Sequence, residues 1–371
     1  MDSNSERSEP DSYKEYSEIL MDEESKLKKE DVKPFLNFLK GKRIYLSLSG
    51  GGLALVCHIS IIRIIEELGI NVERVYGTSA GSVIGGLYAA GLGWKQMRDA
   101  ALRLKKPDDL FGFGSKHIII RAIKSEIEAT FKKSEYPRAA IYNNKRLESY
   151  IESNILKFFG RIPLLGELKL PFSAIAFDIG DDSDEGHRLS SKKVFSTENT
   201  PEVTLKDAIV ASISIPGVFP PKEIGSHYYI DGGVVENLPI VTAYEDWIKR
   251  KRFYQKNLVI IGVDLGYGGE TLKVKSNIKP HDLLIYAFSV EGKTINQYSL
   301  LRVHKPRKGS NVILLKPRCY DIGLTDFEKI PEAMVNSYDR VCEQIKGKRF
   351  LNETKEDIEK AKIMLGINEK I

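Results

Sequence analysis

The chain has 371 residues, of which 42% are hydrophobic and 29% are charged, the composition of a folded protein with a substantial core. Its three cysteines show no paired spacing, which argues against a disulfide framework and against a zinc site. The sequence contains no apolar run of about 18 residues, so we expect no membrane-spanning helix.

The formal charge of +5 is unevenly distributed. Residues 1–33 carry eleven acidic and six basic side chains, so the positive excess lies in the rest of the chain. Such an excess fits either a solvated surface of mixed charge or a face directed to an anionic membrane. Because no dense basic block with interleaved aromatic residues occurs, we expect no nucleic-acid partner. The polar N-terminus predicts no cleaved signal peptide, so we expect a cytoplasmic or peripheral-membrane protein, with signal-less export left open.

The first elements lead to a run of glycines. Residues 1–33 are polar and poor in apolar side chains, which predicts a disordered or loosely helical segment. The run 43–49 alternates like a strand and ends at three glycines, Gly50, Gly51 and Gly52. Glycines in this position let main-chain N–H groups approach a negatively charged group of a ligand or a reaction intermediate.

The segments that follow alternate between helix and strand. Apolar spacing predicts a helix over residues 58–68 with Gly69 just after its end. A short strand is expected over Val72–Tyr76, and a second helix over Ala80–Ala90, ended by Gly91. This alternation predicts a parallel sheet that is covered by helices.

The turn between that strand and helix reads VYGTSAGS and fits the pattern G-x-S-x-G, with Ser79 between Gly77 and Gly81. A serine on a strained strand-to-helix turn needs small neighbours, which the two glycines supply. The following helix directs its N-terminus at the serine and favours negative charge there. The alternative is a glycine-rich turn with an incidental serine.

The middle of the chain contains a helical insert over Trp94–Leu156. Within it, the stretch DDLFGFGSKHIII fits three alternative roles: a lid over the site, an interfacial patch that contacts a bilayer, or a connection packed in the core. Its apolar residues are Leu110, Phe111, Phe113, Ile118, Ile119 and Ile120. Further along, we expect strands over 172–177, 258–264 and 311–315, a polar loop over 178–191, a helix over 205–212, and mainly amphipathic helices after about residue 280.

A serine nucleophile requires a base. The histidines that follow Ser79, none of them in a distinctive motif, are His117, His187, His227, His281 and His304. The second candidate is the segment YYIDGGVVENLP, in which Asp231 ends an apolar run and precedes Gly232 and Gly233. The same Asp-Gly pair is also typical of a hairpin turn. The residues by themselves therefore leave the base open.

The order of these motifs resembles the patatin-like phospholipase family. The glycine triplet, the G-x-S-x-G turn, ASISIPGVFPP at Ala211–Pro221 and DGG at Asp231–Gly233 follow one another over about residues 42–241. The resemblance implies an α/β fold, a three-layer α/β/α sandwich with a mostly parallel central sheet and a nucleophile elbow, plus additional C-terminal helices. It divides the chain into a charged, flexible N-terminal segment (1–40), a catalytic domain (41–245) and a C-terminal extension (246–371).

The resemblance also implies a function. Ser79 would be the nucleophile and Asp231 the base of a Ser–Asp dyad, without a catalytic histidine, cofactor or metal. The protein would cleave acyl ester bonds of phospholipids or related lipids through an acyl-enzyme. Gly50, Gly51 and Gly52 would form the oxyanion hole, supported by Gly77, Gly81, Gly232 and Gly233. Expected partners are the lipid or acyl-ester substrate and a membrane surface; the oligomeric state is left open.

The glycine loop departs from the family pattern G-G-G-x-(Arg or Lys)-G, since Ala54 and Leu55 stand at its last two positions. If Leu55 needed a positive φ, leucine would cost about 1–2 kcal/mol there; with a negative φ it would pack against the helix. The departure motivates an alternative, a catalytically impaired lipid-binding or regulatory protein. His58 matches a family histidine that we interpret as structural.

Two further alternatives come from other classes. A conventional α/β-hydrolase would use a Ser–Asp–His triad and would depend on one histidine. A nucleotide-binding loop would need G-x-G-x-x-G, which fails at Leu55, or a Walker A motif, whose Gly-Lys-Ser/Thr is missing.

Overall fold

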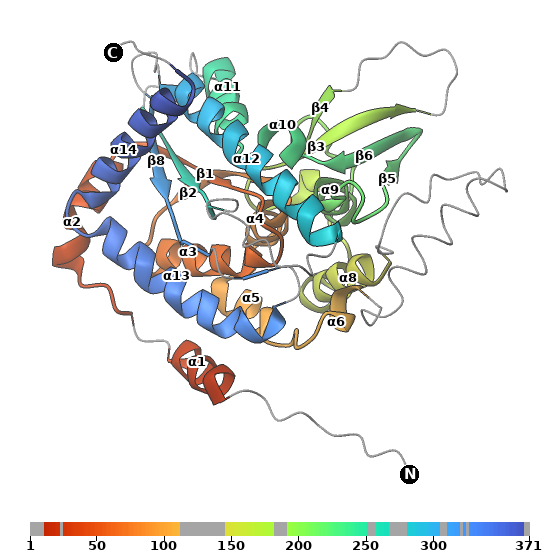
Figure 1. The fold of residues 1–371 in the computed structure, drawn as a ribbon, viewed down its shortest axis with the longest axis horizontal. Coiled ribbons are helices and arrows are strands. Elements are labelled where there is room, and N and C mark those ends of the chain that lie inside the picture. Colours follow the sequence, from red (N-terminus) through yellow and green to blue (C-terminus); the bar gives the residue numbers. More distant parts are fainter. Residues whose placement is uncertain are drawn as a thin grey trace.

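One mixed β-sheet with helices on both faces forms the body of the molecule (Figure 1). The structure, a computed structural model, describes residues 11–22, 25–111, 145–181, 191–250, 257–266, 280–304, 310–319, 322–323 and 326–366. The strands are β1 (Arg43–Leu48), β2 (Val72–Thr78), β3 (Phe172–Asp181), β4 (Ser191–Ser196), β5 (Lys222–Ile224), β6 (His227–Asp231), β7 (Leu258–Val263) and β8 (Ser310–Leu315).

The helices alternate with these strands in the first half of the chain and dominate its end. They are α1 (Asp11–Met21), α2 (Lys29–Leu39), α3 (Leu55–Glu67), α4 (Ala80–Ala90), α5 (Trp94–Ala101), α6 (Asp108–Phe111), α8 (Lys145–Phe159), α9 (Leu205–Ile213), α10 (Gly233–Glu236), α11 (Ile240–Arg250), α12 (Pro280–His304), α13 (Ile330–Ile345) and α14 (Arg349–Met364). Short 3₁₀ segments are η1 (Gly52–Ala54), η2 (Leu165–Glu167) and η4 (Phe327–Lys329).

The sheet has the order β5-β6-β3-β2-β1-β7-β8 within the described residues, and β4 pairs with β3 beside this path. Neighbours from β3 through β2, β1 and β7 to β8 run parallel, whereas β4, β5 and β6 pair antiparallel. The carboxyl ends of the parallel strands therefore meet at one edge, where sheets of this kind form their ligand sites. The predicted α/β class with a mostly parallel sheet is confirmed.

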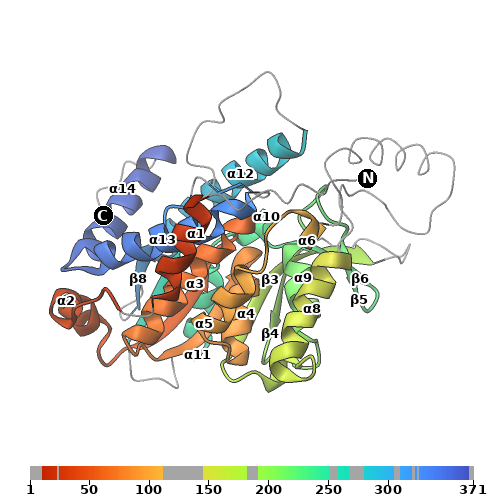
Figure 2. The ribbon, with the colours of Figure 1, turned by 90° about the horizontal axis from the view of Figure 1, so that it is seen from below.

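Two buried clusters show why the sheet is covered on both faces. On β1, Ile44 and Leu46 pack into a cluster with helix α3, while Tyr45 packs into a second cluster with Trp247 of α11. Side chains that alternate along a strand point to opposite faces, so a strand buried throughout needs helices on each side. Figure 2 shows α3, α4 and α5 covering one of these faces.

The elements with strong local periodicity lie where they were predicted. The helix expected over Ala80–Ala90 is α4, and Gly91 follows it at φ 107°. The strand expected over Val72–Tyr76 extends two residues further, to Thr78. Two strands were not predicted. Strand β4 begins where the expected polar loop ends, and β5 follows Pro220 and Pro221.

The apolar residues of the helical insert are only partly described. Leu110 is buried in the core. Phe113, Ile118, Ile119 and Ile120 lie outside the described residues, and the side chain of Phe111 is not described.

The N-terminal segment differs from the expected flexible tail. It contains α1 and α2, and both helices place apolar side chains in the interior. Val32 is fully buried, and Phe35 makes an edge-on ring contact with Phe350 of α14. The guanidinium of Arg98 donates to the carbonyl of Leu20 at 2.9 Å. These helices are held by packing against distant segments, which local composition does not reveal.

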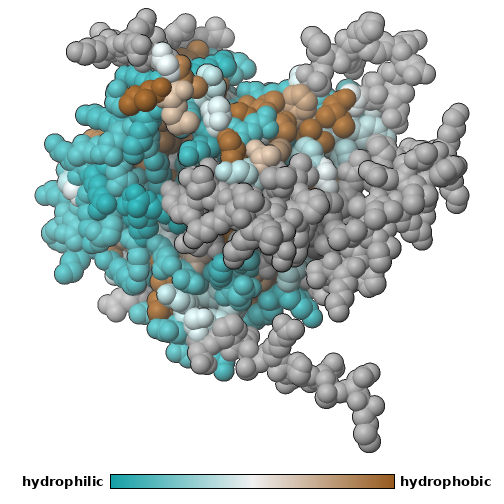
Figure 3. All heavy atoms as spheres, viewed as in Figure 1, coloured by the Kyte–Doolittle hydropathy of each residue, from teal (hydrophilic) through white to brown (hydrophobic). Residues whose placement is uncertain are grey.

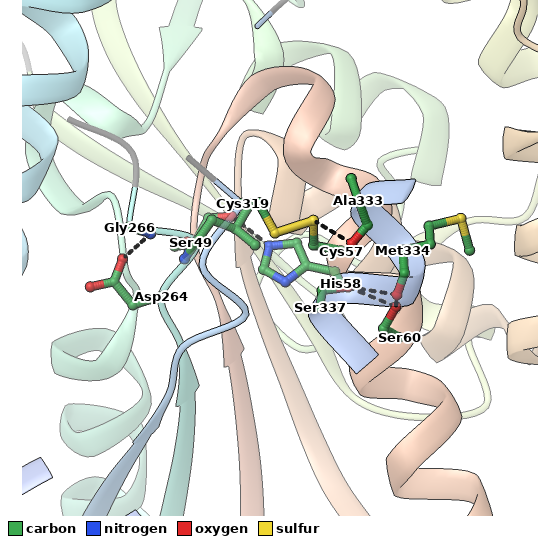
Figure 4. The surroundings of a disulfide bond; sticks show 11 residues. Ser49, Cys57, His58, Ser60, Asp264, Gly266, Cys319, Ala333, Met334 and Ser337 are labelled. Atoms are coloured by element: carbon green, nitrogen blue, oxygen red, sulfur yellow. Dashed lines mark hydrogen bonds between the residues drawn. A yellow bond between two sulfur atoms is a disulfide. The ribbon is translucent and has the colours of Figure 1, made fainter. Parts of the chain in front are cut away.

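A disulfide joins Cys57 of α3 to Cys319, which follows β8. The sequence-based expectation of unpaired cysteines is therefore wrong for this pair, since the two residues are separated by 262 positions and meet through the fold. Cys342 is the remaining cysteine and is buried. The bond links the helix after the glycine loop to the C-terminal extension (Figure 4).

Candidate active site

Ser79 occupies a strained turn at the carboxyl end of β2. Its φ of 51° and ψ of −121° place it outside the regions that a serine favours, and among the described residues only Arg318 shares a positive φ without being glycine. Strain of this kind costs about 1–3 kcal/mol and persists where surrounding contacts enforce it. Helix α4 begins at the next residue, so its N-terminus lies at the serine.

The glycines around Ser79 permit three segments to approach closely. A Cβ on Gly77 would lie 2.4 Å from the carbonyl oxygen of Gly81, and a Cβ on Gly81 would lie 2.1 Å from that of Leu48. Neither glycine has a positive φ, so both are required for space. They bring β1, the turn and α4 together at the edge where the sheet presents its strand ends.

Ser212, at the end of α9, anchors the turn. Its Oγ accepts the peptide N–H of Ser79 at 2.9 Å and donates to the carbonyl oxygen of Ile175 at 2.5 Å. Ser212 is fully buried, so these hydrogen bonds are shielded from water. The residue lies within the ASISIPGVFPP motif, but sequence reasoning assigned it no role.

Asp231 ends β6 next to this turn. Its backbone N–H donates to the carbonyl of Ser214 at 2.9 Å, and its Oδ1 accepts the N–H of Gly233 at 2.7 Å. The carboxyl is fully buried. A Cβ on Gly232 would lie 2.3 Å from the carbonyl oxygen of Ile175, so this glycine allows the strand end to approach β3.

Burial dominates the electrostatics of Asp231. Desolvation raises the pKa of its carboxyl to about 7, although hydrogen bonding with the Ser79 hydroxyl and the Gly233 N–H opposes the shift. Its Oδ2 has no partner of standard hydrogen-bond geometry in the described part of the chain, so the contact with Ser79 is a loose one. Catalytic contacts are often loose before a substrate binds. A carboxyl with a pKa near neutrality beside a serine hydroxyl has the properties of a general base.

The glycine loop lies directly against Ser79. A Cβ on Gly50 would lie 3.1 Å from Cβ of Ser79. The N–H of Gly50 donates to the carbonyl oxygen of Asn237 at 3.0 Å. Within the described residues, no acceptor is present for the N–H groups of Gly51 and Gly52. These half-buried donors directly follow Gly50, the loop residue that lies against Ser79, which makes them candidate donors for a ligand bound there.

The two departures from the family loop fit a regular helix start. Ala54 is fully buried with φ −60°, and Leu55 has φ −47° as α3 begins. Leucine carries no backbone strain there, and its side chain packs against the core. The burial of Ala54 leaves no solvent-facing room for a long basic side chain at that position.

Contacts behind the loop hold it in place. His58 Nε2 donates to the carbonyl oxygen of Ser49 at 2.9 Å, and the ring is fully buried (Figure 4). Desolvation lowers the pKa of His58 to about 4, so the ring is neutral at neutral pH. On the other side, Leu265 donates its N–H to Ser49 Oγ at 3.1 Å and fills the space beside Gly51. His58 therefore has the structural role that the sequence indicated.

The remaining histidines contribute no contact to Ser79 where they are described. His227 pairs with Asp178 at 3.0 Å, and His304 lies at the end of α12. His117 and His187 are outside the described residues, and the side chain of His281 is not described.

Comparisons with known proteins agree on one family. A family model described as Patatin-like phospholipase matches residues 46–244. An NTE family protein of Mycobacterium tuberculosis is 28% identical over 198 residues, which cover 53% of this chain and 44% of that protein. Lysophospholipase NTE1 of Yarrowia lipolytica is 23% identical over 370 residues, covering 90% of this chain and 21% of that protein. The chain thus spans less than half the length of these relatives.

Solved structures are similar only at low identity. Human GIVD cytosolic phospholipase A2 is 10% identical with a TM-score of 0.41, covering 94% of this chain and 63% of that one. VipD from Legionella pneumophila is 13% identical with a TM-score of 0.38, covering 82% and 67%.

Proposed function

Because the chain belongs to the patatin-like phospholipase family, we propose that it is a serine acyl hydrolase that cleaves ester bonds of phospholipids or related lipids. The observation that carries the proposal is the buried Asp231 carboxyl, with a pKa raised to about 7, beside the hydroxyl of the strained Ser79. In this account Ser79 is the nucleophile and Asp231 is its base.

Acylation proceeds by two proton transfers, to and then from Asp231, and one exchange of bonds at the carbonyl carbon. The Ser79 Oγ attacks the ester carbonyl carbon while its proton moves to an oxygen of Asp231. The carbonyl oxygen becomes an oxyanion. When the tetrahedral intermediate collapses, the bond to the alcohol breaks, and the leaving oxygen takes the proton from Asp231. An acyl-enzyme on Ser79 remains.

Deacylation repeats these steps with water. Asp231 accepts a proton from water as the water oxygen attacks the acyl carbon, and then returns the proton to Ser79 Oγ as the fatty acid leaves. The ionised Asp231 is needed at the start of each half-reaction. A pKa near 7 lets it accept and return protons at neutral pH without a histidine.

The oxyanion is stabilised by main-chain donors of the glycine loop. The unpaired N–H groups of Gly51 and Gly52 are assigned to it, whereas Gly50, whose N–H is bonded to Asn237, provides the close approach to Ser79. Each such donor is typically worth about 10²–10³-fold in rate. The dipole of α4 adds a favourable field at the serine.

Exposed apolar side chains on α12 and α14 are consistent with a lipid substrate. Large apolar side chains that remain exposed include Val290 and Tyr298 on α12 and Ile363 and Met364 on α14, and Figure 3 shows hydrophobic residues on the face that these helices cover. None of the described helices is long and apolar enough to cross a membrane. We assign these residues to peripheral contact with a lipid surface.

The alternative, an impaired lipid-binding protein, has less support. It rested on Ala54 and Leu55 in the glycine loop, whereas both residues have a negative φ and the N–H groups of Gly51 and Gly52 are unpaired within the described residues. An intact main-chain arrangement favours turnover.

Hydrolysis of a p-nitrophenyl acyl ester and of a lysophospholipid tests the proposal. The wild-type protein is expected to hydrolyse both, while Ser79→Ala and Asp231→Asn, each verified as folded by circular dichroism, lose turnover. The variant His227→Gln serves as the control, because His227 follows Ser79 in the chain and pairs with Asp178. Activity retained in this variant argues against a triad that uses this histidine. Activity retained in both dyad variants would exclude the proposal.

A further inference from the structure

Asn237, which follows α10, lies where the glycine loop meets α12. Its main-chain oxygen accepts the N–H of Gly50 at 3.0 Å. Its side chain reaches the same glycine, since a Cβ on Gly50 would lie 2.4 Å from Asn237 Oδ1 and 3.1 Å from Ser79 Cβ. The carboxamide and the nucleophile are therefore neighbours on one side of the loop.

A second glycine faces the carboxamide from α12. A Cβ on Gly292 would lie 3.2 Å from Cγ and 3.4 Å from Nδ2 of Asn237. Neither Gly50 nor Gly292 has a positive φ, so backbone conformation does not require a glycine at either place. Both positions instead leave the space that the Asn237 carboxamide occupies.

Among the described residues the carboxamide makes no hydrogen bond, and its two polar atoms are not among the fully buried unpaired ones, so they are open to solvent or to a ligand. Asn237 is half-buried, so its carboxamide is held between Gly50 and Gly292 while its polar atoms stay reachable. Since no hydrogen bond fixes which end faces the loop, a half-turn about χ2 presents the Nδ2 donor toward the serine. A confined, unpaired amide beside a nucleophile is suited to bind the reacting group.

We propose that Asn237 is a substrate-contacting residue whose Nδ2 donates a hydrogen bond to the ester carbonyl oxygen as it becomes an oxyanion. This inference rests on the proposed acyl hydrolase function. It adds one side-chain donor to the main-chain N–H groups of Gly51 and Gly52. Because the contact strengthens as negative charge develops, it acts on kcat more than on KM.

Replacement of Asn237 by leucine tests the proposal, since leucine keeps the approximate shape and removes both polar ends. We expect kcat on a p-nitrophenyl ester to fall about 10²–10³-fold with KM changed only a few-fold. Phosphonylation of Ser79 by a fluorophosphonate should slow in parallel, because the phosphoryl oxygen occupies the same hole. Asn237→Ala should give the same result, and Asn154→Leu, a half-buried asparagine on α8, is the matched control.

The outcomes separate the inference from the function on which it rests. If the wild-type protein hydrolyses the ester and either folded variant of Asn237 retains its kcat, the inference is wrong and the dyad stands. An effect on KM alone, or loss of the folded state in both variants, also overturns it, since Asn237 would then bind the ground state or only pack. If the wild-type protein shows no turnover, the proposed function itself fails.

Discussion

The peptide N–H of Ser79 donates to Oγ of Ser212 at 2.9 Å, across 133 residues of sequence. The same hydroxyl donates to the carbonyl oxygen of Ile175 at 2.5 Å. Ser212 therefore ties the end of α9 to both the nucleophile turn and β3. It also occupies the N–H of Ser79, which leaves the glycine loop to supply the main-chain donors in the proposed mechanism.

Removal of the Ser212 hydroxyl should impair catalysis through the position of Ser79. We expect Ser212→Ala to lower kcat by up to about 10²-fold, because misplacement of a reacting group by about 1 Å has effects of this size. KM should change little. Steady-state kinetics on a p-nitrophenyl ester provides the measurement.

Ser214→Ala is the matched control for this prediction. Ser214, the residue after α9, is also buried, but its Oγ donates to the carbonyl of Val210 one turn earlier, while its contact with Asp231 is through the main chain. Equal losses of kcat in the two variants would argue against a specific role for Ser212.

The pH dependence of activity should follow Asp231. Its carboxyl must be ionised to accept the Ser79 proton, so kcat/KM is expected to rise with pH around a midpoint near the raised pKa of about 7. A rate profile on the ester substrate across this midpoint provides the check. A rate that does not change there would contradict the assignment of Asp231 as the base.

The same shift predicts a stability effect. A carboxyl whose pKa is higher in the folded than in the unfolded state binds more protons when folded, so its burial destabilises the fold as pH rises from about 4 to about 7. Above this window the cost is about 4 kcal/mol, of which Asp231→Asn should recover a part. We expect the variant to melt higher than wild type above the window and to gain nothing below it; a lower melting temperature at both pH values would contradict this.

Restoring the family glycine at Leu55 should not raise the proposed activity. Leu55 has φ −47° at the start of α3 and packs against the core, so Leu55→Gly removes buried apolar surface and adds backbone freedom. We expect a loss of about 1–3 kcal/mol in unfolding free energy by chemical denaturation, with no gain in kcat. A clear rise in kcat would show that leucine had distorted the loop.

The disulfide should stabilise the protein. Reduction of the Cys57–Cys319 bond is expected to lower the free energy of unfolding by about 2–4 kcal/mol. Alkylation of the denatured, unreduced protein, followed by intact-mass measurement, should label Cys342 only, and all three cysteines after reduction. Labelling of three cysteines before reduction would contradict the bond.

Local pattern predicted the elements that carry the nucleophile. The G-x-S-x-G spacing, the apolar strand before it and the small-residue helix after it all lie within about twenty residues, and the fold places them as α4 and β2. The strand ending at Asp231 was likewise visible, whereas its proximity to Ser79 followed only from the family resemblance.

Contacts between distant segments account for what the sequence did not predict. Ser212 and Asn237 lie inside motifs that were recognised, but their partners are the Ser79 turn and the Gly50 loop. The helices before residue 40 depend on docking partners such as Phe350. The effect of Leu55 on the glycine loop could not be predicted, because it depends on the sign of the residue's φ. That angle is set by where α3 begins.

The most direct test of the central claim is the site of reaction with a fluorophosphonate, followed by intact mass and peptide mapping. We expect one adduct on Ser79 in the wild-type protein, no adduct in Ser79→Ala, and strongly slowed formation in folded Asp231→Asn. An adduct that persists in Ser79→Ala, maps to another residue, or forms equally fast without the Asp231 carboxylate would contradict the Ser79–Asp231 dyad.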